Sequence, residues 1–249
     1  MSDSQLVGLA KDFFQNSLDS SPTSAIMRGH KKYFDQIEEL TEEQFQKEKD
    51  IVDTFIQRLN AIEKDNLTSR EKVTHGMLEF ALSSNKDSLL DRSWEFGAGV
   101  AGFTGFLIDY NQQMFVPDSE SADMMLKRLE LYKRLYTQIA DVQKVGLNNN
   151  RVATERNLLR TIDQLENYLA SSLDQDPLLL VNFSPEISDS EISEWKDKAK
   201  KIIEVNIRPT VSAYLDQLKT EHLPKGRGDD NCGIMWIDGG EESYLRSLR

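Results

Sequence analysis

The sequence is poor in cysteine, and this scarcity excludes several classes of protein. Its 249 residues include a single cysteine, Cys232. A disulfide within the chain is therefore impossible, which excludes a small secreted fold held together by disulfide bonds. A catalytic thiolate at Cys232, paired with His222, is an alternative role for this cysteine. The sequence around Cys232, however, supplies no cluster of positive charge to activate a thiol.

Histidine is almost as scarce. A catalytic zinc ion needs about three protein ligands, often including two histidines one helical turn apart. The three histidines, His30, His75 and His222, contain no such pair. We interpret each as a surface or helix-end histidine, and expect no metal site and no cofactor in this chain alone. There is also no Gly-x-Ser-x-Gly motif for a serine nucleophile, so we assign no catalytic residue.

Positive charge and long apolar runs are also in short supply. Lysine and arginine total 30 against 42 acidic residues, which gives a formal net charge of −12. Such a surface repels nucleic acid and anionic lipid, so we expect neither as a partner. No apolar run approaches the roughly 18 residues of a membrane span, and the first residues do not resemble a signal peptide. We therefore expect a cytoplasmic protein that does not associate with a membrane.

Helical periodicity is the dominant feature that the sequence does contain. Apolar residues recur at spacings of three and four, as in Val52, Phe55 and Leu59, which is typical of amphipathic helices. The sequence therefore predicts an all-α, multi-helix fold. The expected helices lie near residues 3–18, 41–64, 69–92, 119–145, 150–173 and 189–222.

Three of these helices begin with a capping-box pattern. In this pattern a hydroxyl accepts a hydrogen bond from the third backbone amide, and a Glu or Gln side chain reaches back to the cap. The pairs are Thr41 with Gln44, Thr68 with Glu71, and Ser188 with Glu191. Pro209 lies inside the last helix, where its missing N–H predicts a kink or a break.

Glycine gathers first in residues 97–105. Residues 97–102 match the Gly-x-Gly-x-x-Gly dinucleotide fingerprint letter for letter. That fingerprint should follow a buried strand, whereas the residues before it are charged and look helical. We interpret the segment as irregular, closely packed chain and not as a nucleotide site.

A second glycine-rich segment, residues 225–249, is called the tail below. Its apolar run at residues 234–237 predicts one short strand, and residues 243–248 predict the start of a helix. Its acidic residues resemble a calcium loop, but the spacing of the glycine and glutamate is wrong. A lone strand is marginal, so we expect Ile234, Trp236 and Ile237 to be only partly buried. On this interpretation, removing the tail leaves the melting temperature nearly unchanged.

The order of these features resembles the family called domain of unknown function 885. No single motif is specific, and the resemblance rests on the order and spacing of several segments. They are residues 9–14, 22–25, 29–33, 111–115, 124–129, 207–214, 223–224 and 233–244. The resemblance implies a largely helical, gluzincin-type zinc metallopeptidase. In full-length members of the family the zinc site would lie in the second half of the protein. The His-Glu-x-x-His helix of such enzymes, which supplies two zinc ligands and the general base, is absent from this sequence.

The resemblance therefore implies that this chain is the non-catalytic front part of a hydrolase, with residues 1–224 as its helical portion and the tail as the start of the catalytic half. Within the family, this part would form one wall of a substrate cleft. The candidate cleft residues are Gly233, Trp236, Gly239, Gly240 and Tyr244. Zinc and a peptide substrate are then expected only when the second half is present. The alternative is a stand-alone helical binding or scaffold domain, and nothing in the sequence sets its oligomeric state.

Overall fold

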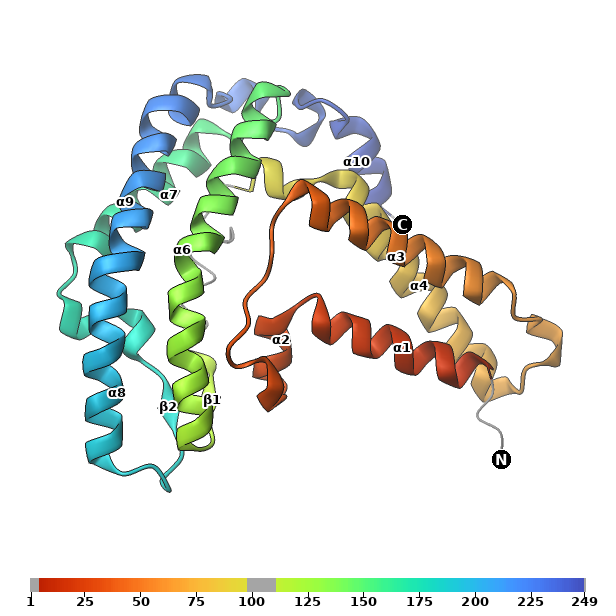
Figure 1. Cartoon of the computed structure of the whole chain (residues 1–249). Coiled ribbons are helices and arrows are strands. Elements are labelled where there is room, and N and C mark those ends of the chain that lie inside the picture. Colours follow the sequence, from red (N-terminus) through yellow and green to blue (C-terminus); the bar gives the residue numbers. More distant parts are fainter. Residues whose placement is uncertain (1–4, 98–110, 249) are drawn as a thin grey trace.

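The computed structural model describes residues 5–97 and 111–248, and the fold of these ranges is all-α, as the helical periodicity predicts (Figure 1). The N-terminal helices are α1 (Gln5–Asp19), α2 (Pro22–Met27), α3 (Glu42–Asn60) and α4 (Ser69–Asp91). The C-terminal helices are α6 (Ser119–Asn148), α7 (Glu155–Ala170), α8 (Asp189–Ile202), α9 (Arg208–Gln217) and α10 (Gly240–Ser247).

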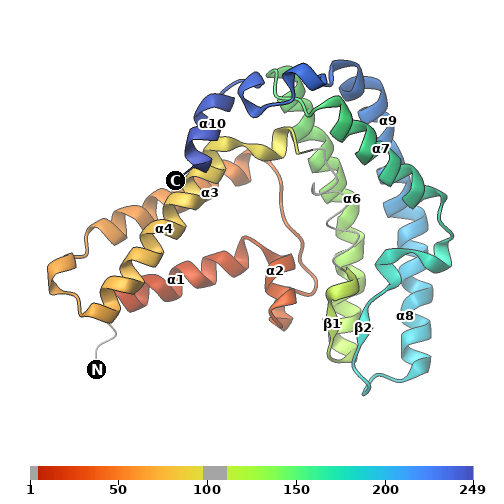
Figure 2. The same ribbon diagram turned by 180° about the vertical axis from the view of Figure 1, so that it is seen from behind.

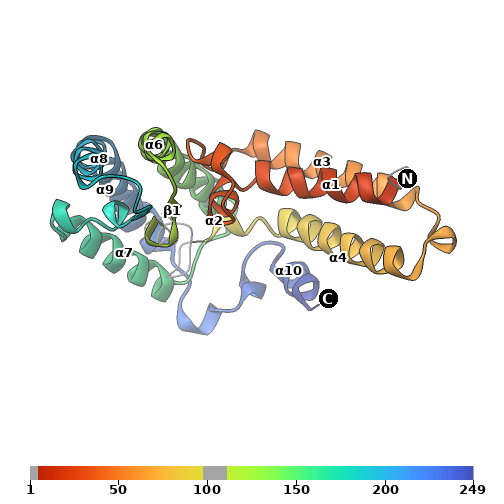
Figure 3. The same cartoon turned by 90° about the horizontal axis from the view of Figure 1, so that it is seen from below.

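The helices form two groups that meet at one end, like the sides of an arch (Figures 1 and 2). Helices α1, α3 and α4 pack on one another in the first group, and α6 to α9 pack together in the second. Helix α4 has α1 and α3 on one side, while α10 contacts its other side (Figure 3). The end of α4 and the tail lie where the two groups meet.

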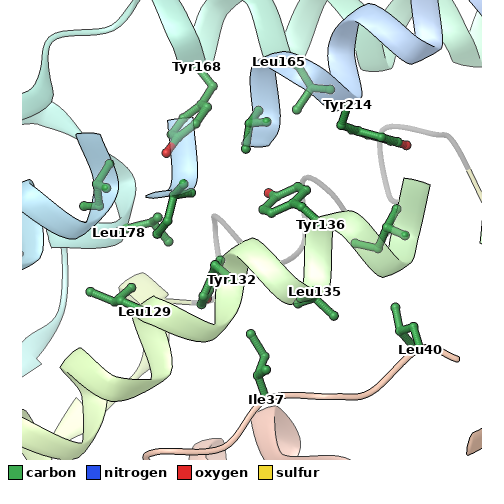
Figure 4. Close-up of a cluster of buried hydrophobic side chains, with 14 of the residues drawn as sticks. Ile37, Leu40, Leu129, Tyr132, Leu135, Tyr136, Leu165, Tyr168, Leu178 and Tyr214 are labelled. Carbon is green, nitrogen blue, oxygen red and sulfur yellow. The ribbon is translucent and has the colours of Figure 1, made fainter. Parts of the chain in front are cut away.

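The described residues form two hydrophobic cores, and the larger one also includes Leu18 of α1, Ile26 of α2 and Phe45 of α3. The larger core is built on α6, whose Leu129, Tyr132 and Tyr136 are completely buried against Leu165 of α7 and Tyr214 of α9 (Figure 4). The smaller core joins α1, α3 and α4 through buried leucines, valine and phenylalanine. Removal of these apolar side chains from water is the main force that holds each group together.

The expected helices are confirmed, with shifted ends. Helix α3 stops at Asn60 instead of continuing to residue 64, and a short 3-10 turn, Lys64–Asn66, follows it. Helix α7 begins five residues later than expected, at Glu155, because the Thr154 hydroxyl caps it by accepting from the Asn157 amide at 3.4 Å. A helix that the sequence analysis missed, α2, starts at Pro22, where proline suits the first helical position.

Two of the three expected capping boxes are complete. The Thr68 and Ser188 hydroxyl oxygens each accept from the third backbone amide of their helix. The carboxylates of Glu71 and Glu191 in turn accept from the backbone amides of Thr68 and Ser188. Thr41 also accepts from the Gln44 amide at 3.1 Å, but the Gln44 side chain donates to Glu48 instead. The box predicted for Thr41 and Gln44 is therefore only half formed.

Pro209 was expected to kink or break its helix, and the helix continues through it without the break. The chain runs from α8 through a π-helical segment, Ile203–Ile207, into α9, with Pro209 in the first turn of α9. A second π-helical segment, Leu218–His222, follows α9. The wider π turn re-registers the backbone hydrogen bonds just where the proline lacks an N–H, so the helix continues without a break.

The structure also has a parallel strand pair that the sequence analysis missed. Strand β1 (Phe115–Val116) pairs with β2 (Asn182–Phe183), and the Asn182 side chain donates to the Gln112 carbonyl at 2.7 Å. Strands of two residues carry no detectable alternation, so periodicity could not have found them. Of the expected glycine-rich segment at 97–105, only Gly97 lies within the described residues.

The tail differs from its prediction. The expected strand at 234–237 is wrong, because Ile234–Trp236 form a 3-10 turn, and the expected helix start is extended to α10. Ile237 is 3% exposed, which contradicts its expected partial burial, whereas Ile234 is half-buried and Trp236 is exposed. A single 3-10 turn buries Ile237 by folding the tail back, which a lone strand would not do.

Candidate functional site

The predicted cleft residues all lie in the tail, but their local roles differ. The Trp236 and Tyr244 side chains are 52% and 53% exposed. Gly239 has φ +70°, a left-handed conformation that favours glycine. A Cβ at Gly240 would stand 1.7 Å from the Ile234 carbonyl oxygen. The two glycines therefore allow the turn into α10, and the two aromatic side chains are presented to solvent.

A buried group of charges holds the neighbouring chain segments together. The Glu95 carboxylate, which is completely buried, lies 2.6 Å from Arg151 Nε and 2.5 Å from an Arg92 guanidinium nitrogen. Arg151 also donates to the backbone carbonyls of Asp91 and Asp238. This network links the end of α4, the loop after α6 and the tail.

Gly146 makes that buried network possible. A Cβ at this position of α6 would lie 2.3 Å from the Glu95 carbonyl oxygen and 2.6 Å from the Glu95 Cβ. Any larger residue would push the 3-10 turn Ser93–Glu95 away from α6. The sequence analysis missed Glu95, Arg151 and Gly146, since no motif connects them and the contacts arise only from the tertiary fold.

Helix α10 is fastened to the last turn of α4. Asp91 accepts hydrogen bonds from Ser243 Oγ at 2.8 Å and from Arg246 Nε at 2.6 Å. Arg227 fixes the start of the tail, because its guanidinium donates to the carbonyls of Val152 and Gly233 at 2.8 and 2.6 Å. The tail is thus held at both ends by arginines paired with backbone or carboxylate oxygens.

A cavity of about 950 Å³ lies between the two helix groups. Its walls include Phe45 and Trp94, whose rings stack with centroids 3.9 Å apart. Glu48 contributes a carboxyl group, and burial raises the pKa of Glu48 above its ordinary value. The lining combines aromatic rings with carboxylates, whereas none of the five predicted cleft residues lines this cavity.

The histidines are placed differently from the sequence-based interpretation. His75 lies within α4 and His222 at the end of a π-helical segment, and both are buried. The prediction of a surface or helix-end position is therefore wrong for His75. The nearest ionic neighbour of His75 is Glu79, with Nδ1 3.9 Å from a carboxylate oxygen. His222 Nδ1 lies 3.4 Å from the Gln217 carbonyl oxygen, while Cys232 is exposed.

Within residues 5–97 and 111–248, no group of three or more His, Cys, Asp or Glu side chains is arranged to hold a metal ion. None of the described helices is long and apolar enough to cross a membrane.

Comparison with protein families identifies the fold's relatives. Residues 22–249 match the family described as "Bacterial protein of unknown function (DUF885)". The chain belongs to this family. The match extends over both helix groups and the tail, and it leaves out α1.

A solved structure shares the fold. The putative lipoprotein from Colwellia psychrerythraea superimposes with a TM-score of 0.81 at 14% sequence identity. The superposition covers 100% of this chain but only 46% of that chain, so the DUF885 chain described here spans less than half the length of this relative. None of the curated proteins matches this chain.

Proposed function

We propose that this chain is the non-catalytic N-terminal part of a zinc metallopeptidase-like hydrolase and forms one wall of its substrate cleft. The observation that carries the proposal is the length relation, because the whole chain superimposes on 46% of the Colwellia protein. The family resemblance supports the peptidase part of the proposal. Its implied partner is a peptide substrate, which is bound when the second half is present.

The described residues do not fit a zinc ion. His75 and His222 are buried, each with a different partner, and no described set of three ligand side chains converges. We therefore derive no zinc-dependent step from these residues. Their proposed contribution is to shape and position the cleft wall, with Trp236 and Tyr244 as aromatic surfaces against which an extended peptide can pack.

Metal analysis and a peptidase assay of the purified chain test this proposal. We expect no stoichiometric zinc after dialysis and no cleavage of a mixed peptide library. One equivalent of retained zinc that is lost in a folded His75→Ala or His222→Ala variant would contradict the proposal. Circular dichroism of each variant separates loss of metal from loss of fold.

A second candidate function is a stand-alone helical binding or scaffold domain. The cavity between the helix groups favours it, because stacked Phe45 and Trp94 beside Glu48 make a concave surface for a ligand that needs no second half. The reading frame downstream of codon 249 discriminates between the two. A continuing frame that encodes His-Glu-x-x-His supports the hydrolase, whereas a natural stop codon supports the binding domain.

We propose the cytoplasm as the location, because a chain with a single cysteine suits a reducing compartment. The word lipoprotein in the description of the Colwellia relative applies to that protein. Cell fractionation with an antibody against the native protein tests the location. Recovery in the membrane or periplasmic fraction would contradict it.

A further inference from the structure

Helix α4 carries a second apolar face that no described part of the chain covers. This face is formed by Val73, Met77 and Phe80, which are spaced four and three residues apart. All three side chains are exposed, and the exposed fraction of Met77 and of Phe80 is 68%. At about 100° per residue, they lie within an arc of about 60° on one side of the helix. The buried residues His75, Leu78 and Leu82 occupy the opposite side. The helix is therefore apolar on two faces, of which α1 and α3 use one.

The exposed face is the same one on which α10 sits. Asp91, the residue that binds Ser243 and Arg246 of α10, lies at the same helical angle as Val73. Figure 3 shows α10 beside the C-terminal end of α4, on the side away from α1 and α3. The apolar face formed by Val73, Met77 and Phe80 therefore continues into the surface of α4 that contacts α10.

Gly76 flanks this apolar face. Glycine in a helix interior is less stable than alanine, so its presence usually has a packing reason. Among the described residues there is none, because a Cβ at Gly76 would have nothing within 4 Å. A glycine next to an apolar face lets another backbone approach the helix closely.

We propose that this face of α4, formed by Val73, Gly76, Met77 and Phe80, docks the second half of the family fold. This inference rests on the proposed function, since it assigns the contact surface of the same two-part protein. The Colwellia relative has more than half of its length beyond the matched part, and an exposed apolar face of the shared fold is a surface on which such additional length can pack. A second copy of this chain is a poorer occupant, because two bodies of formal net charge −12 repel each other.

A binding measurement between two separately expressed chains tests the proposal. The probe is the polypeptide encoded by the frame that follows codon 249, titrated against residues 1–249 by isothermal calorimetry. We expect a 1:1 complex whose Kd rises about tenfold or more in Met77→Ser/Phe80→Ser. The matched control, Leu180→Ser/Val205→Ser, removes two exposed apolar side chains from the other helix group and should leave Kd unchanged.

A glycine pair provides an independent readout. A Cβ at Gly8 of α1, like one at Gly76, would have nothing within 4 Å. Alanine at either position should therefore raise the melting temperature of the chain, through better helix propensity. Only Gly76→Ala should weaken the complex, because only that Cβ would stand between the two halves.

The outcomes separate the two claims. A 1:1 complex that binds the Met77/Phe80 variant as tightly as the original chain overturns the docking face and leaves the proposed function intact. A dimer of residues 1–249 in sedimentation velocity that the same variant dissociates overturns the choice of occupant. A stop codon after codon 249, or a downstream polypeptide that does not bind the original chain, overturns both claims.

Discussion

At the scale of single residues, the fold depends on buried charges that are matched by tertiary contacts. Asp176 is completely buried and accepts from Arg208 Nε and Nη2 at 3.2 and 3.0 Å, while Arg208 also donates to the Ser171 carbonyl at 2.9 Å. Arg128 is buried as well and donates to Thr23 and to the Gln36 carbonyl. Nothing in the sequence marks these side chains as partners, so the sequence analysis could not have selected them from the other charged residues.

Replacing Asp176 tests the importance of such a buried pair. Asp176→Ala leaves the Arg208 guanidinium without its carboxylate in a buried site, so we expect the free energy of unfolding to fall by about 3–5 kcal/mol. Urea denaturation measures this change. The control is Asp229→Ala, which removes an exposed pair with Arg156 and should cost less than about 1 kcal/mol. Equal effects of the two substitutions would show that burial does not decide the contribution.

Glu48 should make stability depend on pH. Burial raises the pKa of Glu48, so the folded chain binds this proton more tightly than the unfolded chain does. The stability that protonation provides is fully present below the pKa of the unfolded chain, and is lost as the pH rises through the higher folded pKa. Glu48→Gln should therefore raise the free energy of unfolding at pH 7, with the gain disappearing in acid. A gain that is the same at both pH values would contradict this explanation.

At the scale of helices, the sequence predicted most of the structure. The three-four spacings located α3, α4, α6 and α8, because each of these helices buries one apolar face. The caps at Thr68 and Ser188 set the first residues of α4 and α8. What it missed depends on contacts made elsewhere. A π turn accommodates Pro209, and Ile234–Trp236 form a 3-10 turn in a tail whose helix α10 packs on α4.

Deleting the tail tests whether that packing is part of the fold. The buried Ile237 and the contacts of Asp91 with α10 remove the basis for the original expectation of an unchanged melting temperature. Removal of residues 225–249 should lower the free energy of unfolding by about 2 kcal/mol or more, since a buried isoleucine alone contributes about 1.5–3 kcal/mol. A chain that ends at Ser247 loses only the exposed Leu248 and the final arginine, and should unfold like the original. If the longer deletion also has no effect, the tail does not stabilise the helical body.

At the scale of the whole molecule, the sequence predicted the class of fold but not how the candidate site is arranged. The five cleft residues were expected from the family resemblance of residues 233–244, and Gly239 and Gly240 in fact shape the turn into α10. No sequence motif marks the exposed apolar face of α4, because Val73, Met77 and Phe80 have the same spacing as residues of a buried core. Only the structure distinguishes the covered face from the exposed one.

The most direct test of the account is a peptidase assay on the polypeptide encoded after codon 249, with and without residues 1–249. If this chain forms one wall of the cleft, kcat/KM on a peptide library should rise by about 100-fold or more when the two are combined, because substrate positioning needs both walls. The chain alone should have no activity. Full activity of the downstream polypeptide by itself, unchanged by this chain, would contradict the account.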